Sequence, residues 1–371
     1  MTAEETIALS KRALMLRTNT VSYVIAGGSL LPRFIGSAAD SSGSHPPSQM
    51  WIASTVTSAL GEGGDGLSRV PLAGGDAYLK DLLEADPEAF MGRAHVDCWG
   101  TNPGYLIKLL NSKDRLLVQV HPDKARAKRY FRSDFGKTEA WYVVDAEDGA
   151  MVHAGFVPGV TKEILRRAIE EQDSDRILGL LHAFPVAAGD VLFIPAGLPH
   201  ALGSGSLVVE IQEPTDITLR AERRRPSGEM LPEEMLHAGL GMDVLLECFD
   251  YDCADRGTVE RRLFLRPLPV RREEGCVEEA LVSYRTTPYF AMHSISMGVG
   301  SVYAKRNAAF SAGLVIAGKG RLEGDGFAAD LERGSEFFIP HGVERYRYSA
   351  SGDLKIIECY PPSSGGEDLR T

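Results

Sequence analysis

The sequence lacks several features that would place the chain in a specialised class. Its 371 residues contain no apolar run long enough to cross a membrane. The first thirty residues do not show the basic, apolar and small-residue succession of a secretion signal. There are 40 Lys and Arg against 51 Asp and Glu, and the net charge of -11 leaves no basic excess to neutralise nucleic-acid phosphates. We expect a soluble, cytoplasmic protein that binds neither nucleic acid nor membrane.

Cysteine is also scarce, and its spacing fits neither a disulfide framework nor a zinc knuckle. The five cysteines, an odd number, are Cys98, Cys248, Cys253, Cys276 and Cys359. We expect free thiols in a reducing compartment.

Chemistry-bearing side chains gather around residues 116–142. In the apolar run at 116–121, Gln119 and His121 alternate with Val118 and Val120. Period-two alternation predicts a strand, with both polar side chains on one face. Glu139 and His200 follow in later β-rich segments. Two imidazoles, a carboxylate and an amide suit a divalent metal such as zinc, while manganese, iron and cobalt also accept these ligands.

An internal repeat indicates the fold. The segment Gly334–Pro340 repeats Gly189–Pro195, with a glycine turn, a short strand and an Ile-Pro end. Many short strands separated by glycine turns are typical of β-sandwiches and small barrels. We predict a mainly β protein of two jelly-roll-like barrels with interspersed helices. Counting from the shared Ile-Pro, the position of His200 falls on Arg345, so the second copy is expected to bind no metal.

Apolar spacing predicts helices within 3–16, 75–92, 122–136, 160–181 and 231–247. In the fourth, Thr161 is a suitable N-cap and Ile164, Leu165, Ala168 and Ile169 are predicted to share one face.

The motifs around these residues resemble those of the type I mannose-6-phosphate isomerases, zinc-dependent members of the cupin superfamily. The matching segments are LIKLL at 106–110, VQVHPD at 118–123, GKTEAWYV at 136–143, IPAGLPHALG at 194–203 and VEIQEPTDITLR at 209–220. The resemblance covers nearly the whole chain. It implies a catalytic cupin domain with helical insertions at 1–225, a helical linker at 226–258 and a metal-free cupin domain at 259–371.

The resemblance also implies roles for individual residues. The zinc ligands would be Gln119, His121, Glu139 and His200. The catalytic residues would be Lys137, Asp216 and Arg220, and the substrate-binding residues Lys108 and Glu210. The implied reaction interconverts mannose 6-phosphate and fructose 6-phosphate through an enediol. Arg220 would hold developing negative charge, and the proton-transferring base would be Asp216, Lys137 or a zinc-bound water.

Each of these polar residues also has a structural interpretation. Lys108 would be a lysine that extends its ammonium to solvent from a helix end, Lys137 a loop lysine paired with Asp134, and Asp216 a turn residue. Glu210 would be an exposed strand residue, and Arg220 part of a solvated basic cluster with Arg223, Arg224 and Arg225.

The sequence departs from the family at the substrate end. Leu117 stands where the family usually has a serine, two residues before the metal-binding glutamine. The usual Gly-Glu-Ser-Trp is Ser48-Gln49-Met50-Trp51, and the segment after Arg220 is arginine-rich. The arginines would then replace part of a phosphate clamp, or the substrate would be an unphosphorylated or related sugar. A metal-binding, sugar-sensing cupin without catalysis, and a metal-dependent oxygenase, are the alternatives from other classes. The residues do not predict an oligomeric state.

Overall fold

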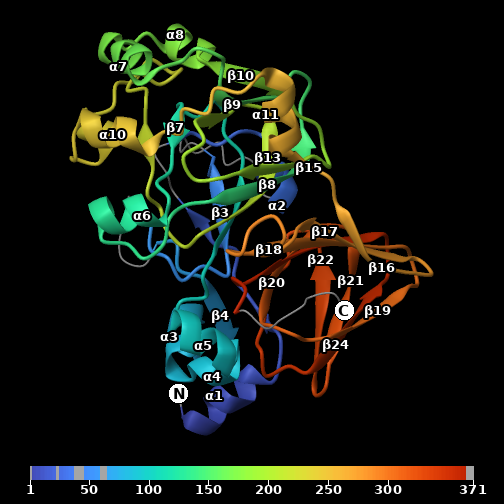
Figure 1. The fold of residues 1–371 in the computed structure, drawn as a ribbon. Coiled ribbons are helices and arrows are strands. Elements are labelled where there is room, and N and C mark those ends of the chain that lie inside the picture. The colour runs from blue at the N-terminus through green and yellow to red at the C-terminus, as the bar shows by residue number, and fades with distance from the viewer. Residues whose placement is uncertain (1, 22–24, 37–45, 59–64, 365–371) are drawn as a thin grey trace.

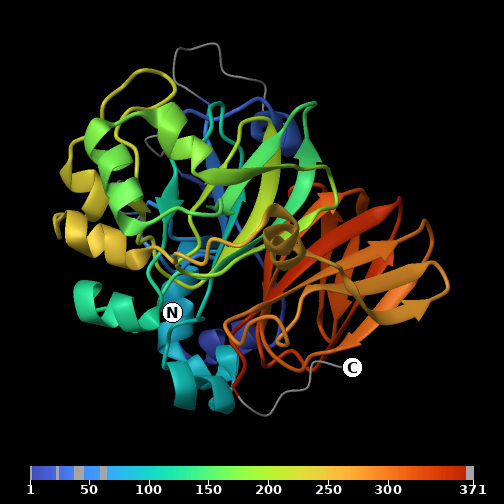
Figure 2. The same ribbon diagram turned by 45° about the horizontal axis from the view of Figure 1, so that its top comes forward.

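The computed structural model describes residues 2–21, 25–36, 46–58 and 65–364. Two β-rich halves lie side by side, and most helices surround the N-terminal half (Figures 1 and 2). The prediction of a mainly β fold is confirmed. No helix within the described ranges is long and apolar enough to span a membrane.

The N-terminal half contains a seven-stranded and a five-stranded antiparallel sheet, which we call the N-terminal sheet pair. The seven-stranded sheet has the order β15-β11-β8-β13-β6-β3-β2, and the other has the order β10-β9-β12-β7-β14. The strands of the first are β2 (Thr20–Val21), β3 (Gln49–Ile52), β6 (Leu106–Leu110), β8 (Glu139–Ala146), β11 (Val191–Ile194), β13 (Ser206–Gln212) and β15 (Phe264–Leu265). Those of the second are β7 (Gln119–Val120), β9 (Met151–Phe156), β10 (Leu181–Pro185), β12 (His200–Leu202) and β14 (Leu219–Arg220).

The C-terminal half repeats this plan in a second set of sheets, the C-terminal sheet pair. Its sheets have the orders β1-β23-β20-β25-β18-β17-β16 and β19-β24-β21-β22. The seven strands are β1 (Leu14–Met15), β16 (Leu268–Glu273), β17 (Cys276–Val282), β18 (Ala291–Met297), β20 (Ser311–Ala317), β23 (Glu336–Ile339) and β25 (Leu354–Tyr360). The four are β19 (Val302–Arg306), β21 (Lys319–Gly324), β22 (Phe327–Glu332) and β24 (Arg345–Ala350).

The repeated Ile-Pro segments occupy equivalent places, since β11 and β23 are both second in their sheets. Arg345 takes the position of His200 when residues are counted from the shared Ile-Pro, but its side chain points to the other face of the sheet. His200 is completely buried and pairs with Gln119, whereas Arg345 is exposed. The neighbouring pair Tyr346 and Lys305 carries the inward-facing side chains, because successive residues of a strand point to opposite faces.

Each half lends one short strand to the other's large sheet. β1, near the N-terminus, pairs with β23, and β15, at the start of the C-terminal segment, pairs with β11. The division into domains at 1–225, 226–258 and 259–371 stays a proposal, and these two strands pair across it.

Three of the apolar clusters in the described part of the chain hold the sheets together. One lies inside the N-terminal sheet pair around Trp141, Phe184 and Val208, and another inside the C-terminal pair around Tyr303 and Phe337. The third joins the outer faces of the two seven-stranded sheets, so the halves pack back to back. Its sheet residues include Met50, Ile107, Val209, Met292, Leu314 and Ile357. Successive side chains of each strand point to opposite faces, so both faces of these two sheets are buried.

The helices depart from expectation mainly at their ends. The described helices are α1 (Ala3–Ser10), α2 (Leu30–Ile35), α3 (Leu79–Ala85), α4 (Pro87–Met91), α5 (Arg93–Trp99), α6 (Lys124–Arg126) with a π turn at Ala127–Phe131, α7 (Lys162–Glu171), α8 (Ser174–Gly179), α9 (Glu234–His237), α10 (Met242–Cys248) and α11 (Arg256–Leu263). Thr161 caps α7 by accepting from the backbone N–H of Ile164. Ile164 itself is exposed, against expectation, because the buried stripe is Leu165, Ala168 and Ile169.

Two predicted helices were partly wrong because strands interrupt them. The segment 3–16 leaves its helix after Ser10 and continues into β1. The segment 75–92 begins as β5 (Gly75–Tyr78), which pairs with β4 (Arg69–Leu72) before α3 starts. Sheet pairing overrides the weak helical spacing in both. The five cysteines are free, as predicted.

The interior of the C-terminal sheet pair encloses an ion network centred on Lys305. Its ammonium donates to Glu278 at 2.8 Å, to Glu358 at 2.8 Å and to the Tyr360 hydroxyl at 2.7 Å. Burial alone would lower the pKa of Lys305, but the charges of Glu358 and Glu278 raise it. Burial alone would raise the pKa of Glu278, but the bond from His293 and the charge of Lys305 hold it far below its ordinary value. Glu278 is therefore ionised, and it depends on this ammonium.

Replacing Lys305 by Met should destabilise the fold by about 3 to 5 kcal/mol, because two buried carboxylates lose their counter-charge. Urea unfolding at pH 7 measures the loss, and Lys319→Met, an exposed lysine on β21, is the matched control. Ionised Glu278 contributes stability above its ordinary pKa of 4.5, and this contribution is lost as the pH falls below that value. The difference between wild type and variant should therefore narrow in acid. Equal stability of the two at pH 7 would contradict the assigned role of the network.

Candidate metal centre and cavity

Three strand ends of the N-terminal sheet pair bring His121, Glu139 and His200 together. His121 follows β7, Glu139 opens β8 and His200 opens β12. One potential ligand atom from each lies within 4.8 Å of the other two, and all three residues are buried. His200 on β12 and Gln119 on β7 are cross-strand partners, so two of the expected ligands lie side by side. The four residues proposed from the sequence as ligands are thus neighbours in space.

Backbone carbonyls orient both imidazoles. The Nδ1 of His121 lies 3.0 Å from the carbonyl oxygen of Ile217, and the Nδ1 of His200 lies 2.9 Å from that of Leu198. A carbonyl only accepts, so each Nδ1 carries the proton and each Nε2 presents a lone pair. The two Nε2 atoms face Glu139, at 3.4 Å from His121 and 3.3 Å from His200. This is the tautomer in which a histidine binds metal through Nε2.

The electrostatics keep the ligands ready to bind a cation. Burial, followed by the charge of Lys137, lowers the pKa of His121 to about 3, so its imidazole is neutral at pH 7. Burial alone would raise the pKa of Glu139, but Lys137 and His121 hold it well below its usual range. Lys137 places its Nζ 3.0 Å from His121 Nε2 and 3.3 Å from a Glu139 oxygen. A metal on His121 would use the lone pair that this ammonium now contacts.

Gln119 completes the set from the neighbouring strand position. Its amide Nε2 lies 3.2 Å from His200 Nε2, and a half-turn of the amide would present Oε1, the atom that binds metals, at the same place. Within the described part of the chain, neither buried oxygen of Glu139 has a hydrogen-bond partner. Two imidazoles, an amide oxygen and this carboxylate fit zinc.

A second polar cluster lies on the inner face of the seven-stranded sheet of the N-terminal pair. Lys108 on β6 donates to Gln212 at 2.8 Å, and its ammonium lies 3.4 Å from Glu210 and 3.6 Å from Asp216. Glu210 also accepts from the indole N–H of Trp141 at 3.2 Å. Burial, followed by the charge of Glu139, raises the pKa of Glu210. Lys108 and Glu210 are therefore buried members of one cluster rather than the exposed residues of the structural interpretation.

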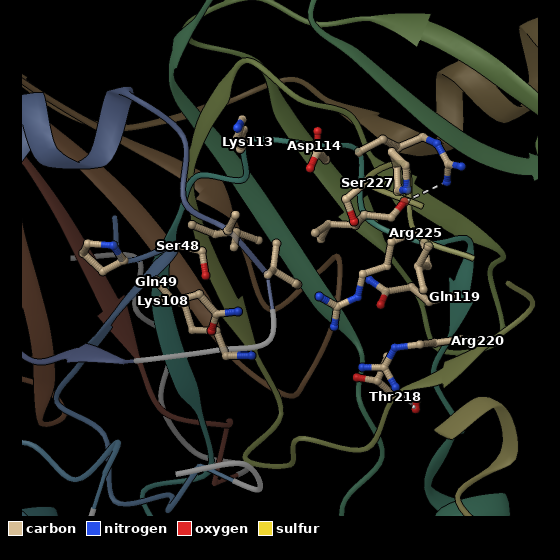
Figure 3. A pocket seen from close by; sticks show the side chains of 18 of the residues that line it. Ser48, Gln49, Lys108, Lys113, Asp114, Gln119, Thr218, Arg220, Arg225 and Ser227 are labelled. Atoms are coloured by element: carbon tan, nitrogen blue, oxygen red, sulfur yellow. Dashed lines mark hydrogen bonds between the residues drawn. The ribbon is translucent and has the colours of Figure 1, made fainter. Parts of the chain in front are cut away.

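A cavity of about 580 Å³ connects this cluster with the ligand set. Figure 3 shows Lys108 on one side and Gln119, Arg220 and Arg225 on the other. Arg220 donates from Nη1 to the carbonyls of Thr218 and Met235, both at 3.3 Å. Leu117, which replaces the expected hydroxyl, also lines the cavity. The structure brings every predicted site residue to this cavity or to the ligands beside it.

Sequence reasoning missed Glu213, which holds the backbone on both sides of Lys137. Its buried carboxylate accepts from the N–H groups of Thr138 at 3.0 Å and Gly136 at 3.3 Å, and lies 3.6 Å from the Lys124 ammonium. It belongs to the quoted motif at 209–220, but the carboxylate carries no local signal of its target, which lies 75 residues earlier. Glu213 therefore positions both Lys137 and Glu139.

The sequence is similar to those of two bacterial proteins. The chain is 32% identical over 258 residues, 69% of this chain and 73% of the relative, to "Mannose-6-phosphate isomerase" of Streptococcus mutans. It is 30% identical over 301 residues, 81% and 87% of the two chains, to "Probable mannose-6-phosphate isomerase GmuF" of Bacillus subtilis. No family model matches the chain.

Solved structures show the same fold. The mannose 6-phosphate isomerase of Bacillus subtilis superposes with a TM-score of 0.74 at 22% identity, covering 94% of this chain and 99% of that one. A zinc-bound mannose 6-phosphate isomerase superposes with a TM-score of 0.73 at 16% identity, covering 95% and 100%.

The fold and the site define a β protein of the cupin type with a buried group of residues suited to a metal. The identities narrow this class to one family of aldose–ketose isomerases. The chain belongs to the mannose-6-phosphate isomerase family, and the resemblance read from its motifs is confirmed.

Removing an imidazole should empty the metal centre. We expect His121→Ala and His200→Ala to lose bound zinc and turnover together, because each removes one of only two nitrogen ligands. Elemental analysis of the purified variants measures the zinc, and His237→Ala, on α9, is the control. Full zinc content together with wild-type turnover in either variant would disprove the ligand assignment.

Removing Glu213 should loosen the metal centre without removing a ligand. We expect Glu213→Ala to weaken zinc binding about 10- to 100-fold, the usual effect of losing a residue that orients ligands. Competition with a chromophoric chelator measures the affinity. Glu170→Ala, an exposed carboxylate on α7, should bind zinc as the wild type does. Unchanged affinity in Glu213→Ala would show that Glu139 is held without it.

Proposed function

We propose that this chain is a zinc-dependent isomerase that interconverts mannose 6-phosphate and fructose 6-phosphate through an enediol. The observation that carries the proposal is the convergence of His121, Glu139 and His200 with Lys137 beside one cavity. The names of the relatives supply the sugar. Zinc, held by Gln119 and these three ligands, supplies a Lewis acid for the substrate's oxygens.

Arg220 is suited to hold negative charge as it develops on the sugar. Its guanidinium is anchored through Nη1 by two backbone carbonyls, and the remaining donors of the planar fork can bind an oxyanion. Because the side chain is held in advance, it needs little rearrangement during the reaction.

The chain offers two groups for moving a proton between adjacent carbons, Lys137 and Asp216, and both line the cavity. Lys108 lies 3.6 Å from the Asp216 carboxylate and 3.4 Å from Glu210, and both acidic residues line the cavity. Glu210, with its pKa raised by burial, is suited to bind sugar hydroxyls. Asp216 can serve as the base, and Lys137 can do so only in its neutral form.

Arg225 is our candidate for phosphate recognition. It lines the same cavity as Leu117, which has no hydroxyl to offer. Its side chain is 15% exposed and lies 3.0 Å from Glu229, whose side chain is 61% exposed. A largely buried guanidinium that shares one well-solvated carboxylate can also bind a phosphate dianion.

A coupled assay of mannose 6-phosphate and of unphosphorylated mannose tests the function and the substrate together. We expect turnover of the phosphate ester, and a rise in its KM of about tenfold or more in Arg225→Gln, the usual loss for one charge-assisted hydrogen bond. Turnover of unphosphorylated mannose should be equally slow in the wild type and in Arg225→Gln, because mannose has no phosphate for Arg225 to bind. Arg223→Gln is the control, because Arg223 donates to Leu231 and lies outside the cavity lining.

The other outcomes separate the alternatives. Zinc-loaded protein that binds mannose 6-phosphate but converts neither sugar would be a sugar-sensing cupin. Mannose turnover equal to that of its phosphate would make the substrate an unphosphorylated sugar.

A further inference from the structure

A second hollow, of about 640 Å³, lies at the rim of the C-terminal sheet pair. It is formed where β19 ends, β24 begins and the hairpin of β21 and β22 turns. These four strands are labelled in the right half of Figure 1. Its charged lining residues are Arg271, Lys305, Arg306, Arg345, Arg347, Glu323 and Asp325. Five cations thus face two carboxylates in a protein whose net charge is -11.

Two of these cations lie directly opposite each other. Arg306, the last residue of β19, is the ladder partner of Arg345, the first residue of β24. Cross-strand partners share a face of the sheet, and like charges at such positions destabilise the pair. Neither guanidinium forms an ion pair or side-chain hydrogen bond with any residue in the described part of the chain. This sheet end therefore carries two uncompensated charges.

The other charges of the hollow are mostly matched. Arg347 donates to Glu323 with a distance of 3.1 Å, and Arg271 pairs with Glu273 and donates to the carbonyl of Ala304. Lys305, at the inner side of the hollow, is neutralised by the buried network described above. Asp325, in the hairpin turn, is the remaining carboxylate. A net positive charge stays concentrated at Arg306 and Arg345.

We propose that this rim hollow binds a small, multiply charged phosphate compound between Arg306 and Arg345. Guanidinium groups bind phosphate oxygens through two parallel N–H donors, and two forks on adjacent strands can hold one di- or polyphosphate. The bound anion would relieve the repulsion between the two arginines. The rim hollow lies in the C-terminal sheet pair and shares no lining residue with the catalytic cavity. The proposal is therefore independent of the function proposed above.

Pyrophosphate is the probe, and hydrogen exchange of β19 and β24 is the local readout. We expect pyrophosphate to slow amide exchange in residues 302–306 and 345–350 with a saturable dependence on concentration. In the double variant Arg306→Gln with Arg345→Gln, half-saturation should require at least about tenfold more pyrophosphate, since charge-assisted bonds are lost. Inorganic phosphate should bind more weakly than pyrophosphate in the wild type, because it offers fewer oxygens and charges.

The double variant Lys319→Gln with Arg321→Gln is the matched control. It removes the same charge from the same sheet, but both residues lie outside the hollow, and Arg321 is paired with Asp330 at 3.1 Å. Protection in this control should match the wild type. Equal protection in both double variants, or protection reproduced by sodium chloride at the same ionic strength, would overturn the proposal. Mannose 6-phosphate turnover, if present, should be the same in all three proteins.

Discussion

The constraint that organises this molecule is the placement of acidic side chains inside two β structures. The inner face of each seven-stranded sheet carries buried acidic side chains, Glu139 and Glu210 in one half and Glu278 and Glu358 in the other. A buried charge is costly unless an opposite charge is close. In the C-terminal half the opposite charge is the Lys305 ammonium, which lies 2.8 Å from Glu278 and 2.8 Å from Glu358. The N-terminal half surrounds Glu139 with lone-pair nitrogens and Lys137, an arrangement open to a divalent cation.

The common topology makes this comparison direct. β13 and β25 take the same place in sheets of the same strand order, and they carry Glu210 and Glu358. The pair Gln119 and His200 faces inward in one half, and Lys305 and Tyr346 face inward in the other. The two interiors differ chiefly by one side chain. In the C-terminal half, the Lys305 ammonium pairs with Glu278 and Glu358. In the N-terminal half, potential metal-binding atoms lie beside a cavity instead.

The back-to-back packing of the large sheets gives the site its rigidity. The outer face of each is buried against the other, and each half extends the other's sheet by one short strand. Strands buried on both faces cannot shift register without exposing apolar side chains. Glu139, which opens β8 of the large N-terminal sheet, is therefore held in position. The contacts of Glu213 with the backbone around Lys137 add to this. The uncompensated Arg306 and Arg345 lie at the rim of the C-terminal sheet pair, away from this packing.

The sequence by itself determined the β class, the internal repeat and the set of metal-ligand candidates. These depend on local patterns: alternation around Gln119 and His121, the twice-used Ile-Pro segment, and a family resemblance carried by contiguous motifs. Predicted helices failed where β1 and β5 found partners, because strand pairing is decided by residues far away in the chain. Which tautomer each histidine adopts, that Lys108 is buried with two carboxylates, and that Arg306 faces Arg345 were decided only by the tertiary structure. Each of these depends on a distance between residues on different strands, and spacing along the chain carries no information about such distances.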